Sequence, residues 1–269
     1  MTDSKEKKLR NSILRMVLIY YLAESAFFFL IVRFYQFSQA FCLVFLGVQT
    51  IFLFFVSLYL LIKRRFFYLV KSGEMLSSVN LASKITFFRL SMIPFILFLI
   101  IAMKNSFRVG HVLAPLIGLT CLSDLFDGYI SRRRSEETFM GKILDSACDY
   151  LFLGLVAIAY YYYRLLPGWL FWLILSRLLL HSAGMAILFR LRRKLIPQTT
   201  LWGKIAVAAT MVLFVFKPMA WIFPVMAPGT KFVEIGAGIL IGISLADKAI
   251  YFSRGIARNS AERQGGFSE

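Results

Sequence analysis

The sequence predicts an all-α fold, a polytopic membrane helix bundle of about eight transmembrane helices. Hydrophobic residues make up 59% of the 269 residues, and the mean hydropathy is +0.73. Charged residues make up only 17%, whereas an average soluble domain contains about 25%. An apolar run of about 18 residues or more is long enough to cross roughly 30 Å of hydrocarbon, and several such runs are present. These observations place the chain in a lipid bilayer.

Eight apolar runs, separated by polar or basic turns, are the expected spans. In chain order they are Ile13–Val32, Ala40–Ile62, Ile85–Met103, Val112–Ser131, Gly141–Tyr163, Gly168–Leu191, Leu201–Val225 and Phe232–Phe252. The basic and aromatic stretch 63–78 follows the second span and is expected to lie at the membrane interface. The polar residues after Arg254 are expected to form a frayed tail.

Basic residues predict the orientation of these spans. Of the 31 Lys and Arg residues, 24 fall at one set of helix ends and six at the opposite set, while Arg177 lies inside the sixth span. Cytoplasmic loops carry the excess of basic residues, so both termini are expected in the cytoplasm. Topology and contact with anionic lipid account for the net charge of +17, and no nucleic-acid partner is expected. No organelle address is visible, which favours a bacterial inner (cytoplasmic) membrane.

Four aspartates lie at the cytoplasmic ends of the fourth and fifth expected spans. Asp124 and Asp127 are three residues apart, and Asp145 and Asp149 are four apart, so each pair shares one helix face. The short basic turn between the spans makes them antiparallel neighbours, which lets the four carboxylates converge. One charge at membrane depth costs about 2.5–3.5 kcal/mol, so four together indicate a bound cation. Oxygen ligands favour Mg²⁺ or Mn²⁺, and a carboxylate-rich site often holds two ions.

Residues around the aspartates suggest the substrate. Gly128 and Gly141 let a ligand approach the backbone, and Arg132 can form a forked contact with a phosphate. Carboxylates for metal, glycines for access and an arginine for phosphate indicate phosphoryl-type chemistry on a nucleotide diphosphate. A lone intramembrane aspartate is more often a helix–helix hydrogen-bond partner or part of an ion pathway. Two facing pairs with an arginine argue against those alternatives.

These residues and spacings resemble the signature of the CDP-alcohol phosphotransferases, D-x2-D-G-x2-A-R-x8-G-x3-D-x3-D. The matching residues are Asp124, Asp127, Gly128, Ser131, Arg132, Gly141, Asp145 and Asp149. Every spacing agrees, and the one departure is Ser131, where the family has alanine. The resemblance covers about Ser83 to Phe252 and implies a six-helix catalytic core at 80–253. Residues 1–79 are then two extra N-terminal transmembrane helices with a basic interfacial linker, and 254–269 are a polar C-terminal tail.

The resemblance implies a role for each matched residue. The expected ligands of two divalent ions, Mg²⁺ or Mn²⁺, are Asp124, Asp127, Asp145 and Asp149. Asp149 is also the expected catalytic residue, a general base that takes the proton of the acceptor hydroxyl. The residues expected to bind the CDP moiety are Gly128, Arg132, Thr138, Ser83 and Thr86.

The stretch from Ala82 to Pro94 bears on the acceptor alcohol. It is similar to the P-N-x-L-T-x-x-R-x-x-x-x-P opening of phosphatidylglycerophosphate synthases. Thr86, Arg89 and Pro94 fit that pattern, whereas Ala82 and Ser83 stand where those enzymes have Pro and Asn. Arg89 is accordingly expected to help bind the acceptor.

Two further positions complete the expected acceptor site. The stretch at 202–211 is similar to a G-K-x-K-T segment of the same enzymes, in which Gly203 and Lys204 fit but Ala206 and Val207 replace Lys and Thr. Arg177 matches a buried arginine near the acceptor, and a buried arginine in lipid is rarely structural. Arg177 and Lys204 therefore join Arg89 as expected acceptor-binding residues. The missing lysine at position 206 leaves other acceptors open.

The expected function is transfer of a phosphatidyl group from CDP-diacylglycerol to a small alcohol, glycerol-3-phosphate first, with release of CMP in phospholipid biosynthesis. Alternatives are inositol phosphate or serine as acceptor, a CDP-alcohol donor with diacylglycerol as acceptor, a membrane prenyltransferase and a cation-coupled transporter. The resemblance also implies a homodimer in the lipid bilayer. Glu24, in the first span, is left with two interpretations, a pairing with another span or an accessory function. His111 and His181 are expected to lie outside the site.

Overall fold

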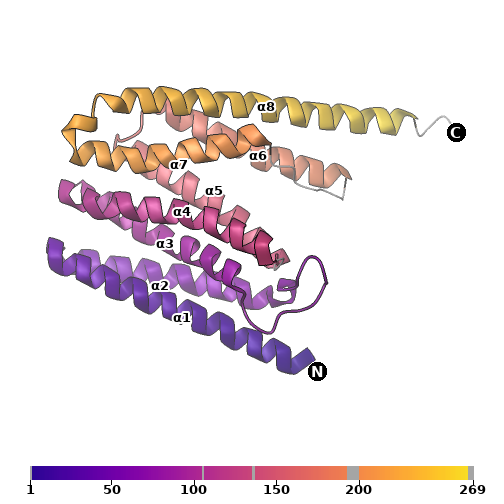
Figure 1. Cartoon of the computed structure of the whole chain (residues 1–269), viewed down its shortest axis with the longest axis horizontal. Coiled ribbons are helices and arrows are strands. Elements are labelled where there is room, and N and C mark those ends of the chain that lie inside the picture. The colour runs from indigo at the N-terminus through magenta and orange to yellow at the C-terminus, as the bar shows by residue number, and fades with distance from the viewer. Residues whose placement is uncertain (1, 105, 135–136, 193–199, 266–269) are drawn as a thin grey trace. The chain divides into compact units, whose positions relative to one another are not determined.

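A computed structural model describes the backbone of residues 2–104, 106–134, 137–192 and 200–265. Inside those ranges, the side chains of residues 2–3, 107, 125, 127–134, 184–192 and 254–265 lie outside the description. The described chain forms eight α-helices with three short 3₁₀-helices (Figure 1). The predicted all-α class is therefore confirmed.

The helices follow the expected order along the chain. The α-helices are α1 (Thr2–Tyr35), α2 (Gln39–Ile62), α3 (Leu81–Met103), α4 (Gly110–Arg134), α5 (Phe139–Tyr162), α6 (Gly168–Arg192), α7 (Leu201–Ile222) and α8 (Gly229–Gly265), and the 3₁₀-helices are η1 (Arg64–Phe66), η2 (Phe107–Val109) and η3 (Pro224–Met226). Ser38, Asn80 and Thr200 begin α2, α3 and α7 as N-caps, because each side chain accepts a backbone N–H that the helix leaves unpaired. Helix α8 continues beyond the expected end at Phe252. Its last residues are mostly good helix formers, which explains why the polar tail predicted to fray is helical to Gly265.

Six of these helices are long and apolar enough to cross a membrane, counted over the described residues: α1 from Ser4, α2, α3, α5, α7, and α8 as far as Ser253. The sequence predicted eight spans. The two helices outside this set, α4 and α6, each end in a stretch whose side chains lie outside the description, and the described part of α6, Gly168–Ala183, is apolar. The chain is an integral membrane protein of helical-bundle type.

Two compact units divide the chain, Met1–Phe152 and Leu153–Glu269. The boundary falls within α5, so the first unit contains the whole stretch of the four aspartates. Each unit is described below by itself. The domain limits expected from the sequence, 1–79, 80–253 and 254–269, stay predictions.

Helix α3 is the centre of the first unit. It packs against α1, α2 and α4, and most of its residues are buried. Aromatic rings join it to the N-terminal hairpin: the rings of Phe28 and Phe45 stack at 3.7 Å between centroids, and Phe95 meets both rings edge-on. Helices α1 and α2 therefore contact the helix that carries Ser83, Thr86 and Arg89.

A buried polar cluster lies in the same interface and answers the question about Glu24. The Glu24 side chain is only 2% exposed. Its carboxylate accepts hydrogen bonds from the Gln49 amide of α2 and from the Ser91 hydroxyl of α3, the latter at 2.5 Å. Polar side chains in a membrane interior are costly unless they find partners of this kind. Glu24 thus pairs with two other helices.

The linker after α2 also reaches the core. Tyr68 and Met75 form a bridge closed by a turn in which Gly73 takes a positive φ of 71°, as glycine does without strain. A second bridge joins the linker to the segment before α5, where the Val70 N–H donates to the Glu137 carbonyl at 2.9 Å and the Phe139 N–H donates to the Tyr68 carbonyl at 3.1 Å. The linker therefore holds the chain at the start of α5.

In the second unit α8 packs against both α6 and α7. Gly238 permits the contact with α6, because a Cβ atom there would lie 2.6 Å from the Trp169 ring. Lys217 of α7 forms a buried ion pair with Glu234 of α8. This packing fixes the helices that carry Arg177 and Lys204.

Candidate active site

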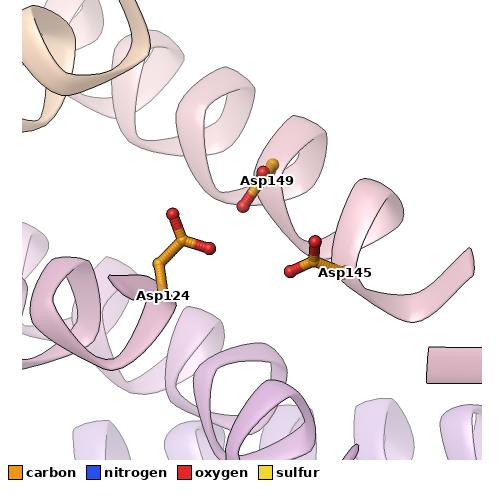
Figure 2. A group of neighbouring side chains, drawn as sticks. All are labelled: Asp124, Asp145 and Asp149. Carbon is orange, nitrogen blue, oxygen red and sulfur yellow. The ribbon is translucent and has the colours of Figure 1, made fainter. Parts of the chain in front are cut away.

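Three of the four aspartates meet in the first unit. Asp124 extends from α4, and Asp145 and Asp149 extend from successive turns of α5 (Figure 2). One carboxylate oxygen from each lies within 4.8 Å of the other two. Figure 2 shows the three carboxylates directed toward a common space between the two helices. The structure thus brings together Asp124, Asp145 and Asp149, as the helical spacing predicts.

The remaining residues of the signature in α4 can be placed only by their backbone. Asp127, Gly128 and Arg132 lie within α4, but their side chains are outside the described part of the chain. Asp127 is three residues after Asp124, so helical geometry puts both on one face. The metal and nucleotide roles expected for these three residues stay predictions.

Arg89 is the cationic partner of the aspartates. Its side chain is 1% exposed, and its guanidinium contacts all three carboxylates. One Nη atom pairs with Asp124, and the other lies 2.5 Å from Asp145 and 3.3 Å from Asp149. The Nε donates toward the Cys148 sulfur at 3.3 Å. The resemblance gave Arg89 an acceptor-binding role, which stays a prediction, but the sequence analysis did not anticipate its contact with the aspartates.

Ser83 and Thr138, both expected at the nucleotide, lie side by side. Their hydroxyl oxygens are 3.2 Å apart, at the N-terminal ends of α3 and α5. Thr138 also caps α5, because its hydroxyl accepts the Gly141 N–H at 2.9 Å. A Cβ atom at position 141 would lie 2.6 Å from Thr138 Oγ1 and 3.1 Å from Ser83 Oγ. Gly141 therefore allows the close approach of these two side chains, whereas the sequence suggested that it admits a ligand.

The same helices connect the hydroxyl pair to the aspartates. Thr86 and Arg89 follow Ser83 at intervals of three residues, so they continue along one side of α3. Thr86 is buried, and its hydroxyl donates to the Ala82 carbonyl at 3.1 Å. On α5, Asp145 lies seven residues after Thr138, a rise of roughly 10 Å. The hydroxyl pair and Asp145 are thus separated by about two turns of α5.

The donor set fits a divalent cation. The three aspartates offer only oxygen ligands, which hard ions such as Mg²⁺ and Mn²⁺ prefer, and their oxygens are close enough to share an ion. Each of the three carboxylates is partly exposed, so an ion can reach it. Carboxylates at this separation repel one another unless a cation lies between them. The residues present are therefore suited to metal binding.

The second unit contains a cluster of basic residues around Arg177. The Arg177 side chain is 6% exposed and donates to the Ser244 hydroxyl at 3.2 Å and to the Gly203 carbonyl at 2.7 Å. One helical turn further along α6 and α8, His181 and Lys248 contact each other through Nδ1 and Nζ. Lys204 of α7 is exposed.

Sequence reasoning assigned Arg177 to the acceptor, a role that stays a prediction, set His181 aside and counted Lys248 only among the basic residues that indicate topology. The signal was present: Arg177 precedes His181 by four residues, and Ser244 precedes Lys248 by four, so each pair shares a helix face. His111, also expected outside the site, is exposed on α4.

Comparison with known proteins identifies the relatives of this chain. The family model for CDP-alcohol phosphatidyltransferases matches residues 79–243, more than half of the chain. A CDP-diacylglycerol–glycerol-3-phosphate 3-phosphatidyltransferase of Aquifex aeolicus is 27% identical over 128 residues, covering 47% of this chain and 68% of that protein. A probable phosphatidylglycerophosphate synthase of Mycobacterium tuberculosis is 28% identical over 188 residues, covering 68% and 87%. A second 3-phosphatidyltransferase, from Bacillus subtilis, is 31% identical over 108 residues, covering 36% and 56%. With three of its four signature aspartates gathered around one space, the chain belongs to the CDP-alcohol phosphatidyltransferase family.

Proposed function

We propose that this membrane transferase moves a phosphatidyl group from CDP-diacylglycerol to glycerol-3-phosphate, with release of CMP. The observation that carries the proposal is the convergence of Asp124, Asp145 and Asp149 inside the segment that matches the family. The relatives named as glycerol-3-phosphate transferases support this acceptor. The product, a phosphatidylglycerophosphate, is a precursor in phospholipid biosynthesis.

Asp149 is the proposed general base. Its carboxylate accepts the proton of the acceptor hydroxyl as the hydroxyl oxygen forms a bond to the phosphorus that carries diacylglycerol. The bond between that phosphorus and the oxygen of CMP breaks, and CMP leaves with the electron pair. Asp124, Asp127 and Asp145 complete a carboxylate set for two divalent ions with Asp149. When bound, the ions supply electrostatic stabilisation of the charge that develops on the pyrophosphate.

The CDP moiety is proposed to extend from the aspartates toward the N-terminal ends of α3 and α5. Ser83 and Thr138 supply hydroxyl groups there, and their contact with each other supports a shared role. On α3, Thr86 lies between Ser83 and Arg89, the residue that contacts the aspartates. Gly128 and Arg132 of α4 are proposed to contact the phosphates from the opposite helix.

The basic cluster of the second unit is proposed to bind the phosphate of the acceptor. Arg177 is nearly buried, and its described hydrogen-bond partners are a hydroxyl and a carbonyl, which are neutral groups. Its positive charge thus stays available to an anion, and His181 and Lys248 lie one turn away. Lys204 is proposed to contact the same phosphate from α7. A phosphorylated acceptor suits this set better than serine does.

The other acceptors differ in how well the residues support them. Inositol phosphate also carries a phosphate for the basic cluster, and Ala206 stands where a second lysine of the glycerol-3-phosphate pattern is expected. Transfer from a CDP-alcohol to diacylglycerol leaves the basic cluster without an acceptor phosphate, because diacylglycerol carries none. A cation-coupled transporter and a prenyltransferase have no support from the family match.

The position in the membrane is part of the same proposal. We place all eight helices across the bilayer, α4 and α6 included, because each contains one of the eight apolar runs of the sequence. Both termini and the aspartates then face the cytoplasm of a bacterial inner membrane, as the distribution of Lys and Arg indicates. The active form is proposed to be a homodimer, as the family resemblance implies.

One assay tests the proposal. The purified chain is given labelled CDP-diacylglycerol with Mn²⁺ and, in separate reactions, glycerol-3-phosphate, inositol phosphate or serine, and CMP release is measured. A CDP-alcohol with diacylglycerol serves as the reversed pair. Release of CMP with glycerol-3-phosphate, together with labelled phosphatidylglycerophosphate, is the expected result. If CMP is released only with a different acceptor, that acceptor takes the place of glycerol-3-phosphate in the proposal. If no pair of donor and acceptor releases CMP, the proposed reaction is refuted.

A further inference from the structure

Arg89 contacts the same carboxylates that are proposed to bind metal. The Oδ1 atoms of Asp124, Asp145 and Asp149 all face its two Nη atoms. The guanidinium is 1% exposed, whereas the carboxylates that it contacts are partly exposed. Its third nitrogen, Nε, lies 3.3 Å from the Cys148 sulfur, and this contact helps to orient the guanidinium group.

The contacts balance only part of the charge of the site. Three carboxylates and one guanidinium leave a net charge of about −2 if all are ionised, and Asp127 on the same face of α4 adds another negative charge. The salt bridges use one oxygen, Oδ1, of each aspartate, so an entering cation either takes those oxygens or binds the second oxygen of the same carboxylates. A guanidinium and a divalent ion on the same carboxylates repel each other at close range. The two cations therefore compete for the charge of the three aspartates.

We propose that Arg89 is a built-in counter-ion of the metal site: it holds the carboxylates together without metal and is displaced when divalent ions bind. Metal loading and movement of the Arg89 side chain are then one coupled step. This inference rests on the proposed metal site and adds a positioning residue to it. The coupling lowers the affinity of the site for metal, because each ion that binds must break the arginine contacts.

A purely structural arginine makes the opposite prediction. If Arg89 only organised the carboxylates, its removal would scatter the ligands and weaken metal binding. If it competes with metal, its removal leaves aspartates that repel one another and therefore bind a divalent ion more tightly. The sign of the change in metal affinity separates the two roles.

The test is a direct titration of Mn²⁺ into the detergent-solubilised full-length chain, with free Mn²⁺ measured by its EPR signal. Arg89→Met keeps the length of the side chain and removes the charge. We expect its dissociation constant for Mn²⁺ to fall at least about tenfold below that of the wild type. We also expect the metal-free variant to melt at a lower temperature than the wild type and to gain more from Mn²⁺.

Lys142→Met is the matched control. Lys142 is also a positive charge on α5, but it is exposed and pairs with Glu137 at 2.9 Å instead of with the aspartates. Its loss should change the Mn²⁺ dissociation constant by less than about threefold, as expected for a screened surface pair. If Lys142→Met changes the Mn²⁺ dissociation constant as much as Arg89→Met does, loss of any nearby positive charge explains the effect. That result would overturn the counter-ion role.

Arg89→Lys covers the case in which the methionine variant does not fold. Lysine keeps the charge but lacks the fork that reaches three carboxylates, so its Mn²⁺ affinity should also exceed that of the wild type. Unchanged or weaker binding in the folded variants overturns the inference while leaving the proposed function in place. If the wild type itself binds no Mn²⁺, the proposed metal site fails, and the counter-ion role fails with it.

Discussion

Each unit of the chain contains a cluster of charged residues, acidic in the first and basic in the second, and the two clusters are paired in different ways. In the first unit, Asp124, Asp145 and Asp149 are met by the full charge of Arg89. In the second unit, the described partners of Arg177 are the neutral Ser244 hydroxyl and Gly203 carbonyl. The arginine in the acidic cluster can be displaced only by a cation of higher charge. The arginine in the basic cluster, which is held by neutral groups, can accept an anion directly. The first is suited to metal ions and the second to a phosphate.

The largest expected effect is in the acidic cluster. Asp124→Asn keeps the size of the side chain but removes one charged ligand, and CMP release should fall by at least about 10³-fold, as when a main electrostatic contact of a transition state is lost. Chelation of divalent ions should stop the reaction, and added Mn²⁺ should restore it.

Glu137→Gln is the control for that variant. Glu137 lies just before α5 and pairs with the exposed Lys142, outside the three aspartates. Its CMP release should stay within about threefold of the wild type. Equal loss in both variants would remove the distinction between the aspartate cluster and neighbouring acidic residues.

Asp149→Asn separates chemistry from binding within the acidic cluster. CMP release should fall by roughly 10²–10⁴-fold, because the amide cannot take the proton of the acceptor. Binding of CMP, measured by calorimetry in Mn²⁺, should be kept. A variant that turns over near the wild-type rate would show that another group is the base.

In the basic cluster, Arg177→Met should affect the acceptor selectively. Loss of a buried charge that pairs with phosphate should raise the KM for glycerol-3-phosphate roughly 30-fold or more, with the KM for CDP-diacylglycerol little changed. Lys231→Met, an exposed basic residue of α8, is the control and should leave both constants unchanged. If Arg177→Met instead raises the KM of the donor, the assignment of the two clusters to metal and acceptor is wrong.

A smaller effect is expected at Gly141. Alanine there would place its Cβ 2.6 Å from Thr138 Oγ1, so the hydroxyl pair must shift. We expect binding of CMP to weaken by about tenfold, since overpacking of this kind costs at least 1 kcal/mol or so. Gly118→Ala in α4, where no atom lies within 4 Å of the added carbon, is the matched control. Unchanged CMP affinity in Gly141→Ala would separate the hydroxyl pair from the nucleotide site.

The smallest expected effect concerns Glu24, a third buried polar group, which belongs to neither charged cluster. Glu24→Leu removes the contacts to Gln49 and Ser91 and should cost about 1 kcal/mol, a fall in Tm of roughly 2–4 °C. Glu24→Gln can keep part of these hydrogen bonds and should lose less. Equal melting temperatures for both variants and the wild type would show that this cluster does not hold α1 and α2 to α3.

Local spacing explains what the sequence could predict. Asp145 and Asp149 are four residues apart on one helix, and Asp124 lies on the helix before it. Their convergence therefore needs only helix geometry and a short connection between the two helices. Contacts between distant segments were not predictable in this way. Arg89 reaches the aspartates because α3 packs beside α4, and Tyr68 meets Phe139 because the linker folds back on the start of α5.

Two other residues illustrate the same limit. Lys248 was taken only as a marker of topology, although its contact with His181 joins α8 to α6. Gly141 was assigned to ligand access because a glycine in a signature indicates a close approach without naming what approaches. The structure identifies Ser83 and Thr138 as the neighbours.

The central claim is that aspartates from α4 and α5 jointly bind divalent ions. The most direct test is the number of Mn²⁺ ions bound per chain, measured at saturation in the presence of CMP for the wild type and for Asp145→Asn. We expect two ions in the wild type and at most one in the variant. Equal numbers in the two proteins would contradict the claim, because a member of the carboxylate cluster would then contribute nothing to metal binding.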